Sequence, residues 1–283
     1  MRSTHPGFLF LAEAYWDLEW ALQQQGFDFC YDKRLYDRLE HGPAEAVHGH
    51  LTGDPDYQQH LVRFVENHDE PRAAAVGDRA RVAAVTALTQ SGARLLQHGQ
   101  LDGRRTRLPV FLGRYPDEPT DPALADFYRA FLDALADPTF HRGRWRLAGL
   151  SGWPGSAAED LVAWCWDGDT RWLVVVNLGD RTAAGQVRFP LEGLPERQWR
   201  LIDPTHGVWF DRSSRDLAGG LYVELAAGDW HLWRMDQAAA PTPGIGGPGW
   251  PGTRRNRPGR PPPAPSWCSR RWPSSRAVTP VPA

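Results

Sequence analysis

The sequence predicts an α/β domain built on a parallel sheet, followed by an all-β domain. Two observations lead to this prediction. Over roughly the first 140 residues, short apolar runs alternate with helix-like segments, which is the rhythm of a parallel α/β sheet. From about Trp145 onward, strands of period two follow one another and are separated by turn residues. We therefore expect an α/β domain at 1–140, an all-β domain at 141–237, and a third region at 238–283.

The third region is rich in Pro, Gly, Arg and Ser and shows no apolar periodicity, so we expect it to be a disordered tail. It contains seven Arg and no Lys, Asp or Glu, which leaves 25 basic and 34 acidic residues in the rest of the chain. The overall formal charge of −2 therefore combines an acidic body with a basic tail. Arginine content alone is a weak indication of nucleic-acid binding, and we expect no nucleic-acid partner.

The composition is that of an ordinary globular protein, with 41% hydrophobic and 23% charged residues. The apolar run Phe8–Ala12 is too short for a signal peptide, and no stretch approaches the roughly 20 apolar residues of a membrane span. The three cysteines lack the spacing of a disulfide framework or a metal site. We expect a cytoplasmic protein with no membrane partner, no metal and no cofactor. The 14 tryptophans are compatible with sugar binding and equally with core packing.

Four strands and the helices between them are expected in the first domain. The strands are predicted at Phe8–Trp16, Phe27–Tyr31, His60–Glu66 and Ala93–Gln97. Helical segments are predicted at Asp17–Gln25, Tyr36–Glu40, Gln58–Leu61, Asp78–Thr89 and Asp121–Leu135. The Gly-, Pro- and His-rich stretch between Glu40 and Gln58 is predicted to be loop.

The second domain is expected to contain seven or eight antiparallel strands arranged as a β-sandwich. The clearest turn signal is Asp167-Gly168-Asp169, which lies between two apolar runs and predicts a hairpin. Strands are predicted at 161–166, 172–178, 186–189, 199–203, 207–210, 221–225 and 230–234.

Polar residues follow the predicted parallel strands, and the carboxyl ends of such strands are where active sites form. These residues are Glu13, Asp28, Asn67-His68-Asp69, His98 and Gln100. Each has an ordinary explanation. Glu13 could be a buried carboxylate paired with an Arg, Asn67 or Asp69 could cap a helix, and His98 could be a loop histidine. Because all four predicted parallel strands are apolar and are each followed by such polar residues, the residues taken together favour an active site.

The motifs in which these residues stand resemble those of a known family. FVENHDEPR, Phe64–Arg72, resembles the strand-7 motif of the alpha-amylase family (glycoside hydrolase family 13), and FLFLAEAYW, Phe8–Trp16, resembles its strand-5 motif. The 56 positions between Glu13 and Asp69 leave room for two βα units. ARLLQHGQLDGRR, Ala93–Arg105, resembles strand 8 and its loop, although Leu101 stands where relatives often carry Glu. The resemblance covers about residues 7–237 and implies the second half of a (β/α)8 TIM barrel followed by a β-sandwich.

The resemblance also implies roles for these residues. Glu13 matches the general acid/base, Asp69 matches the carboxylate that stabilises the transition state, and His68 and Asn67 match substrate-binding positions. The apolar residues around Glu13 are expected to favour its protonated form, as a general acid requires. Tyr15 and Trp16 are candidates for stacking on sugar faces, or else for packing in the barrel core.

The family's nucleophile, an Asp after strand 4, has no counterpart here, and retaining hydrolysis needs one. The resemblance therefore implies a retaining α-glucan hydrolase or transglycosidase by lineage, inactive as this chain alone. We expect Met1 to be an internal or misassigned start. The alternative function is a non-catalytic carbohydrate-binding or assembly protein.

Overall fold

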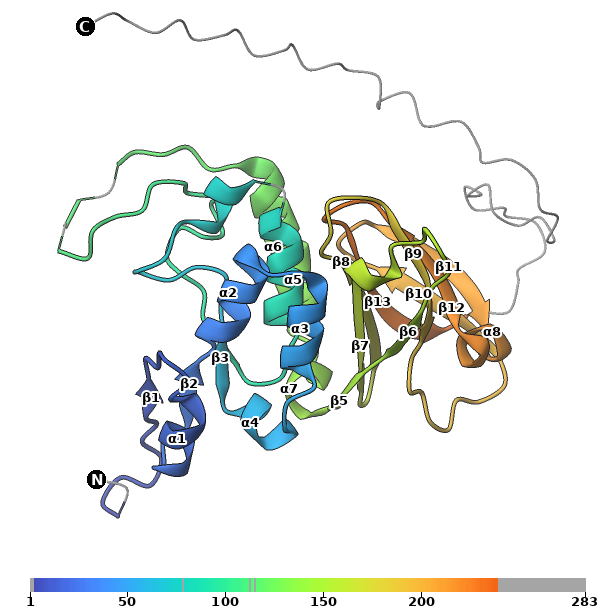
Figure 1. Ribbon diagram of the computed structural model, residues 1–283, viewed down its shortest axis with the longest axis horizontal. Coiled ribbons are helices and arrows are strands. Elements are labelled where there is room, and N and C mark those ends of the chain that lie inside the picture. The colour runs from blue at the N-terminus through green and yellow to red at the C-terminus, as the bar shows by residue number, and fades with distance from the viewer. Residues whose placement is uncertain (1–2, 78, 112, 115, 239–283) are drawn as a thin grey trace, which may run out of the picture. The chain divides into compact units, whose positions relative to one another are not determined.

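The computed structural model describes residues 3–238, apart from 78, 112 and 115, and they belong to one compact unit. Residues 239–283 of the predicted tail lie outside the described residues. An α/β part precedes an all-β part, which confirms the broad fold class (Figure 1). In the described part of the chain, no helix combines the length and the apolar character that crossing a membrane requires.

The α/β part is built on a four-stranded parallel sheet in the order β1-β2-β3-β4. Its strands are β1 (Leu11–Ala12), β2 (Phe29–Tyr31), β3 (Leu61–Arg63) and β4 (Ala93–Arg94), one within each predicted strand. All are shorter than predicted, because regular pairing gives way to loop contacts. At Phe10, for example, the backbone N–H donates to the Asp28 carboxylate at 2.7 Å. Among the described strands the sheet is open and does not close into a barrel.

The helices of this part lie between and after its strands. They are α1 (Glu19–Gln24), α2 (Lys33–His41), α3 (Ala44–Leu51), α4 (Pro55–Gln59), the 3-10 helix η1 (Ala73–Val76), α5 (Arg79–Leu88), α6 (Pro122–Leu135) and α7 (Thr139–Arg142). The prediction of loop between Glu40 and Gln58 was wrong, because this stretch contains α3 and the start of α4. Pro43 is the N-cap residue of α3. Ala44, Val47 and Leu51 are buried on one face of this helix, so the burial of that face outweighs the Gly and His content.

A buried ionic network joins the ends of β2 and β3 to α3 and α4. Asp32 lies within hydrogen-bond distance of Arg63 and of His50 Nε2 (3.0 Å), and also caps α2 by accepting from Leu35 N. Arg63 donates in addition to the Gln58 side chain at 2.6 Å and to the Ser91 carbonyl. Complete burial would raise the pKa of Asp32, but the Arg63 guanidinium outweighs it and holds that pKa low, so Asp32 remains a carboxylate.

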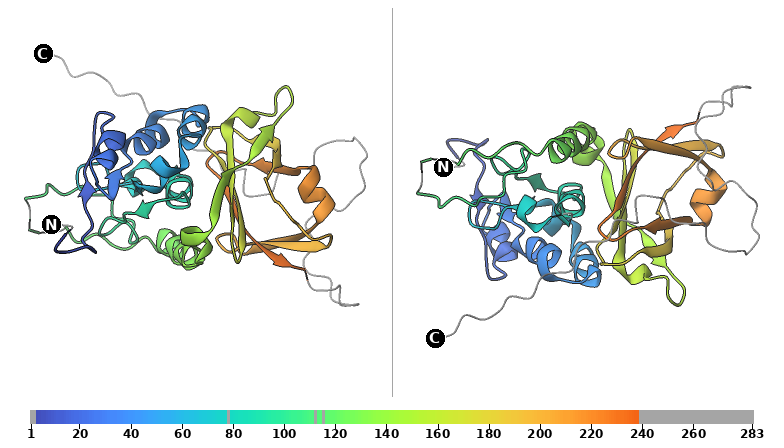
Figure 2. Two further views of the ribbon diagram at one scale, coloured as in Figure 1. Left: turned by 90° about the horizontal axis from the view of Figure 1, so that it is seen from below. Right: turned by 90° about the horizontal axis from the view of Figure 1, so that it is seen from above.

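The all-β part consists of two antiparallel sheets, which lie opposite each other in Figure 2. One has the order β11-β10-β13-β8-β7-β5 and the other β12-β9-β6. All seven predicted strands are present, but β9 begins three residues earlier than predicted and β11 and β13 end three residues later. The short strands β5 and β6 were not predicted. The strands are β5 (Arg144–Leu147), β6 (Gly149–Ser151), β7 (Leu161–Asp167), β8 (Arg171–Asn177), β9 (Ala183–Arg188), β10 (Gln198–Asp203), β11 (Val208–Ser213), β12 (Leu221–Leu225) and β13 (Trp230–Gln237), with helices η2 (Ala158–Asp160) and α8 (Ser214–Gly219).

Two large cores hold these elements. The first lies between the two antiparallel sheets and includes Leu173, Val187, Val223 and Trp233. The second joins the helices to the larger antiparallel sheet, since α5 and α6 pack with β7, β8 and β13 in one buried cluster. The Trp166 indole donates to the Thr89 carbonyl at 2.7 Å within this second core.

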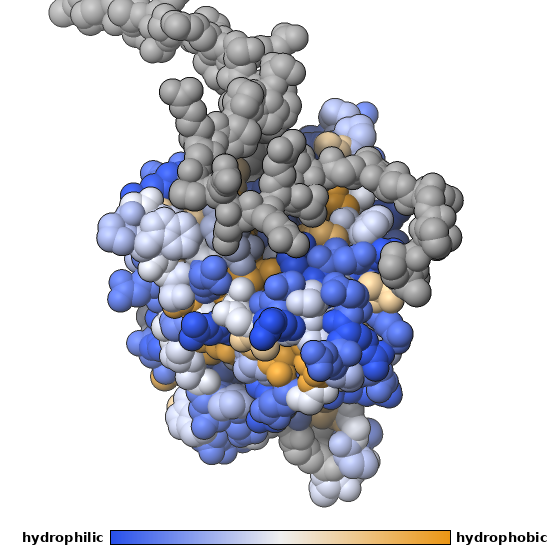
Figure 3. Space-filling view, turned by 90° about the vertical axis from the view of Figure 1, so that its right-hand side faces the viewer, coloured by the Kyte–Doolittle hydropathy of each residue, from blue (hydrophilic) through white to orange (hydrophobic). Residues whose placement is uncertain are grey.

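The outer face on the right of Figure 1 is mainly polar with small separate apolar spots, as Figure 3 shows.

Candidate active site

Glu13 lies immediately after β1, at the carboxyl end of the parallel sheet. Its side chain is 41% exposed, and one carboxylate oxygen accepts a hydrogen bond from the Tyr15 hydroxyl at 2.8 Å. Burial and then this bond raise the pKa of Tyr15, so the phenol keeps its proton and remains a donor. The expected apolar enclosure of Glu13 is wrong, because neighbouring side chains point to solvent: Phe8, Leu9, Leu11 and Trp16 are all about half exposed or more.

His68 and Asp69 stand in the loop after β3, beside Glu13. The His68 Nε2 atom lies 3.2 Å from an Asp69 carboxylate oxygen and 3.8 Å from a Glu13 oxygen. The three ligand atoms all lie within 4.8 Å of one another. Residues separated by 55 positions and carried by two strands therefore meet at one edge of the sheet, as the sequence predicts. A positive imidazole or a cation placed here would reduce the repulsion between the two carboxylates.

The backbone of this loop is held by buried side chains of the same motif. Asn67 is buried, and its side-chain oxygen Oδ1 accepts from the backbone N–H groups of Asp69 (2.8 Å) and Glu70 (3.0 Å). Glu66 accepts from Ala73 N at 2.6 Å and lies 3.1 Å from the Arg72 guanidinium. These contacts close the loop on itself, so His68 and Asp69 are presented outward from a fixed base. Asn67 thus supports the loop from beneath, where sequence reasoning had placed it with the substrate-binding residues.

Arg72 ties this loop to the one after β4. Its guanidinium donates to the carbonyl oxygens of His98 (3.0 Å) and Arg104 (3.3 Å). Gln100, another strand-end candidate, is buried and donates to the Tyr128 hydroxyl at 2.8 Å. Sequence reasoning missed Glu66 and Arg72 as supporting residues, although both stand inside the quoted motif. The sequence does contain an indication of this role, because the oppositely charged Glu66 and Arg72 stand on either side of Asn67-His68-Asp69.

A hollow of about 350 Å³ opens beside the site. Its lining combines the two outward residues of the first loop with a cationic and apolar wall from the later segment: His68, Asp69, Arg107, Pro109, Val110 and Phe111. Phe111 is 85% exposed, so its ring is available to a ligand. A sugar needs hydroxyl partners and an apolar face to stack on, and this hollow offers both.

Of the two predicted stacking residues, Tyr15 is half-buried and engaged with Glu13, whereas Trp16 is 87% exposed. Their rings lie 5.8 Å apart at 54°. Trp16 and Asp17 both have left-handed backbone conformations, with φ of 57° and 64°. Such conformations cost energy in non-glycine residues, and they turn the chain sharply after Tyr15. Packing of Trp16 in a core is excluded by its exposure.

No protein-family profile and no curated protein matches the chain. Solved structures do. The fold is that of alpha-amylases. A maltogenic alpha-amylase from Thermotoga neapolitana has a TM-score of 0.65 at 16% identity, covering 82% of this chain and 56% of that one. The alpha-amylase from Geobacillus thermoleovorans, solved with acarbose, has a TM-score of 0.64 at 14% identity, covering 84% and 55%.

A third alpha-amylase-like structure is the cyclic α-maltosyl-(1→6)-maltose hydrolase from Arthrobacter globiformis, solved with its cyclic sugar. Its TM-score is 0.57 at 18% identity, covering 82% of this chain and 50% of that one. The chain thus spans about half the length of the alpha-amylases it matches. This confirms the resemblance drawn from the motifs, which led to the expectation of a C-terminal portion of such an enzyme.

Proposed function

We propose that the chain is the second half of a (β/α)8 barrel, strands 5–8, with a C-terminal β-sandwich, from a retaining glycoside hydrolase or transglycosidase that acts on α-glucans. The observation that carries the proposal is the meeting of Glu13, His68 and Asp69 at the carboxyl edge of a parallel sheet with the alpha-amylase fold. The domain limits at 1–140 and 141–237 and the cytoplasmic location are part of it.

Each residue receives one role. Glu13, exposed beside His68 and bonded to Tyr15, protonates the glycosidic oxygen and then activates the acceptor. Asp69 contacts ring hydroxyls and stabilises positive charge on the sugar in the transition state. His68, between the two carboxylates, donates to a sugar hydroxyl. Trp16 and Phe111 offer apolar faces for neighbouring rings.

In this proposal the catalytic nucleophile lies on a segment outside this chain. Retaining hydrolysis uses an acid and a nucleophile about 5–5.5 Å apart on opposite sides of the bond. Glu70 follows Asp69 directly in the sequence, but its carboxylate lies 3.1 Å from the Lys33 ammonium, which holds it in an ion pair. We therefore expect the 283-residue chain to bind maltooligosaccharides without hydrolysing them.

Glu13→Gln tests the acid role. In a protein that joins this chain to strands 1–4 of the barrel, the substitution should lower kcat on maltoheptaose by about 10²–10⁴-fold, because the leaving oxygen loses its proton donor. The loss should be much smaller on α-maltosyl fluoride, since fluoride leaves without protonation. Reducing-end release and fluoride release measure the two rates.

Glu159→Gln is the matched control, because Glu159 is 69% exposed and lies in the antiparallel part. It should leave both rates unchanged. An equal loss on both substrates in Glu13→Gln would contradict the acid role while leaving the lineage intact. Hydrolysis by the unjoined 283-residue chain would overturn the proposal that its nucleophile lies elsewhere, and failure to bind maltoheptaose would remove the glucan assignment.

A further inference from the structure

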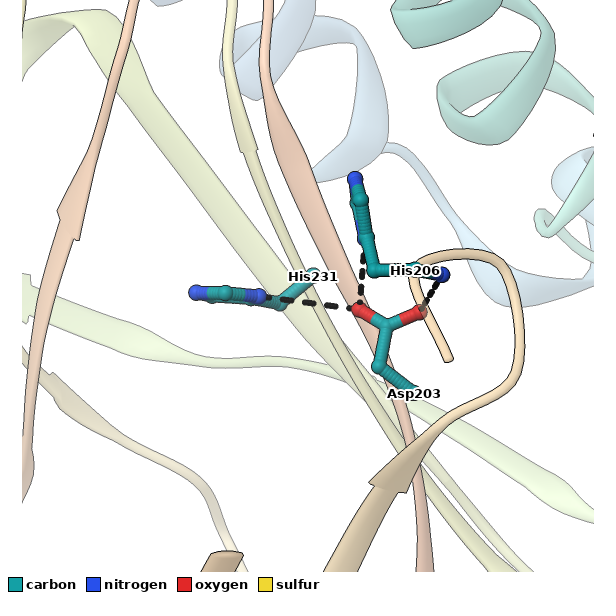
Figure 4. Close-up of side chains that lie close together, drawn as sticks. All are labelled: Asp203, His206 and His231. Atoms are coloured by element: carbon teal, nitrogen blue, oxygen red, sulfur yellow. Dashed lines mark hydrogen bonds and ion pairs between the residues drawn. The ribbon is translucent and has the colours of Figure 1, made fainter. Parts of the chain in front are cut away.

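A buried carboxylate in the all-β part is faced by two imidazoles that the proposed sugar chemistry does not use. Asp203, the last residue of β10, is fully buried. His206 Nδ1 lies 3.0 Å and His231 Nδ1 lies 3.6 Å from the same oxygen, Asp203 Oδ2. Figure 4 shows both rings directed at this one oxygen, His206 from the turn after β10 and His231 from β13. The three ligand atoms lie within 4.8 Å of one another.

The carboxylate is fixed by its other contacts. Asp203 Oδ1 accepts from Thr205 N (3.0 Å), Thr205 Oγ1 (2.6 Å) and His206 N (3.1 Å). Oδ2 accepts from Leu232 N at 3.2 Å, on the strand that also carries His231. The Thr205 hydroxyl is in turn held by the Trp230 indole at 3.0 Å. Oδ2 is therefore oriented toward the two rings before any ligand arrives.

The second imidazole, that of His231, has a buried nitrogen without a hydrogen-bond partner among the described residues. The Nδ1 atom of His231 is buried and makes no hydrogen bond to any described residue, since its distance of 3.6 Å from Asp203 Oδ2 is too long for one. The ring is held in place by stacking on Trp233, with centroids 4.3 Å apart and planes at 22°. A buried polar atom without a partner costs stability, so the position calls for a ligand between His231 and Asp203.

The first imidazole has an outer carboxylate partner. His206 Nε2 lies 3.4 Å from Asp229 Oδ1, on the side of the ring away from Asp203. A carboxylate behind an imidazole places the proton on the far nitrogen and leaves the near nitrogen free to bind a metal, which is how many metal-binding histidines are oriented. Asp229 can therefore present the His206 Nδ1 lone pair to the space beside Asp203.

We propose that Asp203, His206 and His231 form a binding site for a divalent transition-metal ion, with zinc as the best match. The ligands are Asp203 Oδ2 and the two Nδ1 atoms, and water completes the coordination. Zinc bonds of about 2.0–2.1 Å in a tetrahedron separate ligand atoms by about 3.3 Å, and the observed 3.0 and 3.6 Å bracket this value. Two imidazoles with one carboxylate favour zinc over the all-oxygen sites of magnesium and calcium.

The bound ion would connect the turn after β10 to β13. Both rings are partly exposed, His206 by 32% and His231 by 25%, so an ion can enter from solvent. Without an ion, His206 serves as a cation between Asp203 and Asp229, because these two ion pairs outweigh burial and raise its pKa to about 9. A purely ionic cluster of this kind is the competing arrangement, and the experiment must distinguish the two.

Calorimetric titration of the chelator-treated full chain with zinc chloride is the direct test. We expect about one ion per chain to bind with micromolar or tighter affinity. His231→Gln and His206→Gln should each weaken binding at least about tenfold, and Asp229→Asn about tenfold through loss of the outer partner. Zinc at about a hundredfold above the parent's dissociation constant should raise the Tm of the parent by about 5 °C or more, and should raise it less in His231→Gln, His206→Gln and Asp229→Asn.

Two histidine variants serve as controls. His68→Gln removes an imidazole from the other carboxylate cluster, and His41→Gln removes a 72% exposed one, so both should keep zinc binding unchanged. Retention of parental affinity in His231→Gln and His206→Gln would overturn the proposal, as would loss in His68→Gln alone. If a variant fails to fold, cobalt in the parent chain decides: an intense tetrahedral absorption supports the site, and its absence refutes it.

Discussion

At the scale of single residues, Glu66 shows how the candidate site is supported. It is fully buried under the loop that carries His68 and Asp69, with Ala73 N and Arg72 as its partners. Burial outweighs both partners and raises the pKa of Glu66 to about 7. The residue that fixes the loop is therefore the one whose charge changes near neutral pH, while the exposed pair Glu13 and Asp69 faces solvent.

The stability of the chain should depend on pH through Glu66. A carboxyl with a pKa near 4.5 when unfolded and about 7 when folded binds its proton more tightly in the folded state. Stability from this group is therefore complete below about pH 4.5 and declines up to about pH 7, by as much as about 3 kcal/mol. Urea unfolding of Glu66→Gln and of the parent from pH 4.5 to 8 should show the parent losing more.

The exposed Glu196→Gln variant controls for general effects of losing a carboxylate. A difference between the parent and Glu66→Gln that stays constant across this pH range would show that Arg72 keeps Glu66 ionised throughout.

At the scale of elements, α6 has the most complete local signals. Asp121 caps it by accepting from Ala123 N (3.0 Å) and Leu124 N (3.1 Å), and Pro122 occupies its first turn. Phe127 and Phe131 are buried on one face. The sequence predicted this helix almost to the residue because capping, proline placement and apolar spacing agree.

Asp121→Ala should destabilise the chain by about 1 kcal/mol, since two backbone N–H groups lose their acceptor. For a chain of this size that lowers the Tm by about 2–4 °C, measured by circular dichroism. Asp126→Ala in the same helix removes a 70% exposed carboxylate and should change the Tm by less than half as much. Equal effects would assign the cost to helix charge instead of capping.

Local signals explain both what was predicted and what was missed. The four parallel strands and their polar ends could be predicted, because an apolar run followed by Glu13 or by Asn67-His68-Asp69 is visible in a few residues. Helix α3 was missed because its stability comes from a buried face rather than from its composition. The Asp203 cluster was missed because His231 is brought to it by pairing of β10 with β13, which no short window of sequence reveals.

At the scale of the whole molecule, the parallel sheet ends at β1 with apolar side chains in solvent. Leu9 is 67% exposed, Leu11 51% and Trp20 49%. An open strand edge beside exposed apolar residues favours pairing with another chain. The strands proposed to precede β1 would cover this region in an intact barrel.

We therefore expect the 283-residue chain to self-associate as its concentration rises, through the β1 edge. Leu11→Lys should shift sedimentation toward the monomer, because a charged residue on an edge strand opposes pairing. Trp153→Lys, which changes a 47% exposed aromatic residue in the antiparallel part, is the control and should leave association unchanged. If Trp153→Lys dissociates the assembly and Leu11→Lys does not, the contact lies elsewhere.

The indole bond from Trp166 to the Thr89 carbonyl has a consequence for protein engineering. Trp166, Trp172 and Trp230 of the larger antiparallel sheet are buried in a cluster shared with α5 and α6. If only residues 141–237 were moved into another protein, these three indoles would lose the helices that bury them and would be exposed to solvent. Such a module would need new helices on that face, or α5 and α6 transplanted with it, before it could be exchanged between proteins.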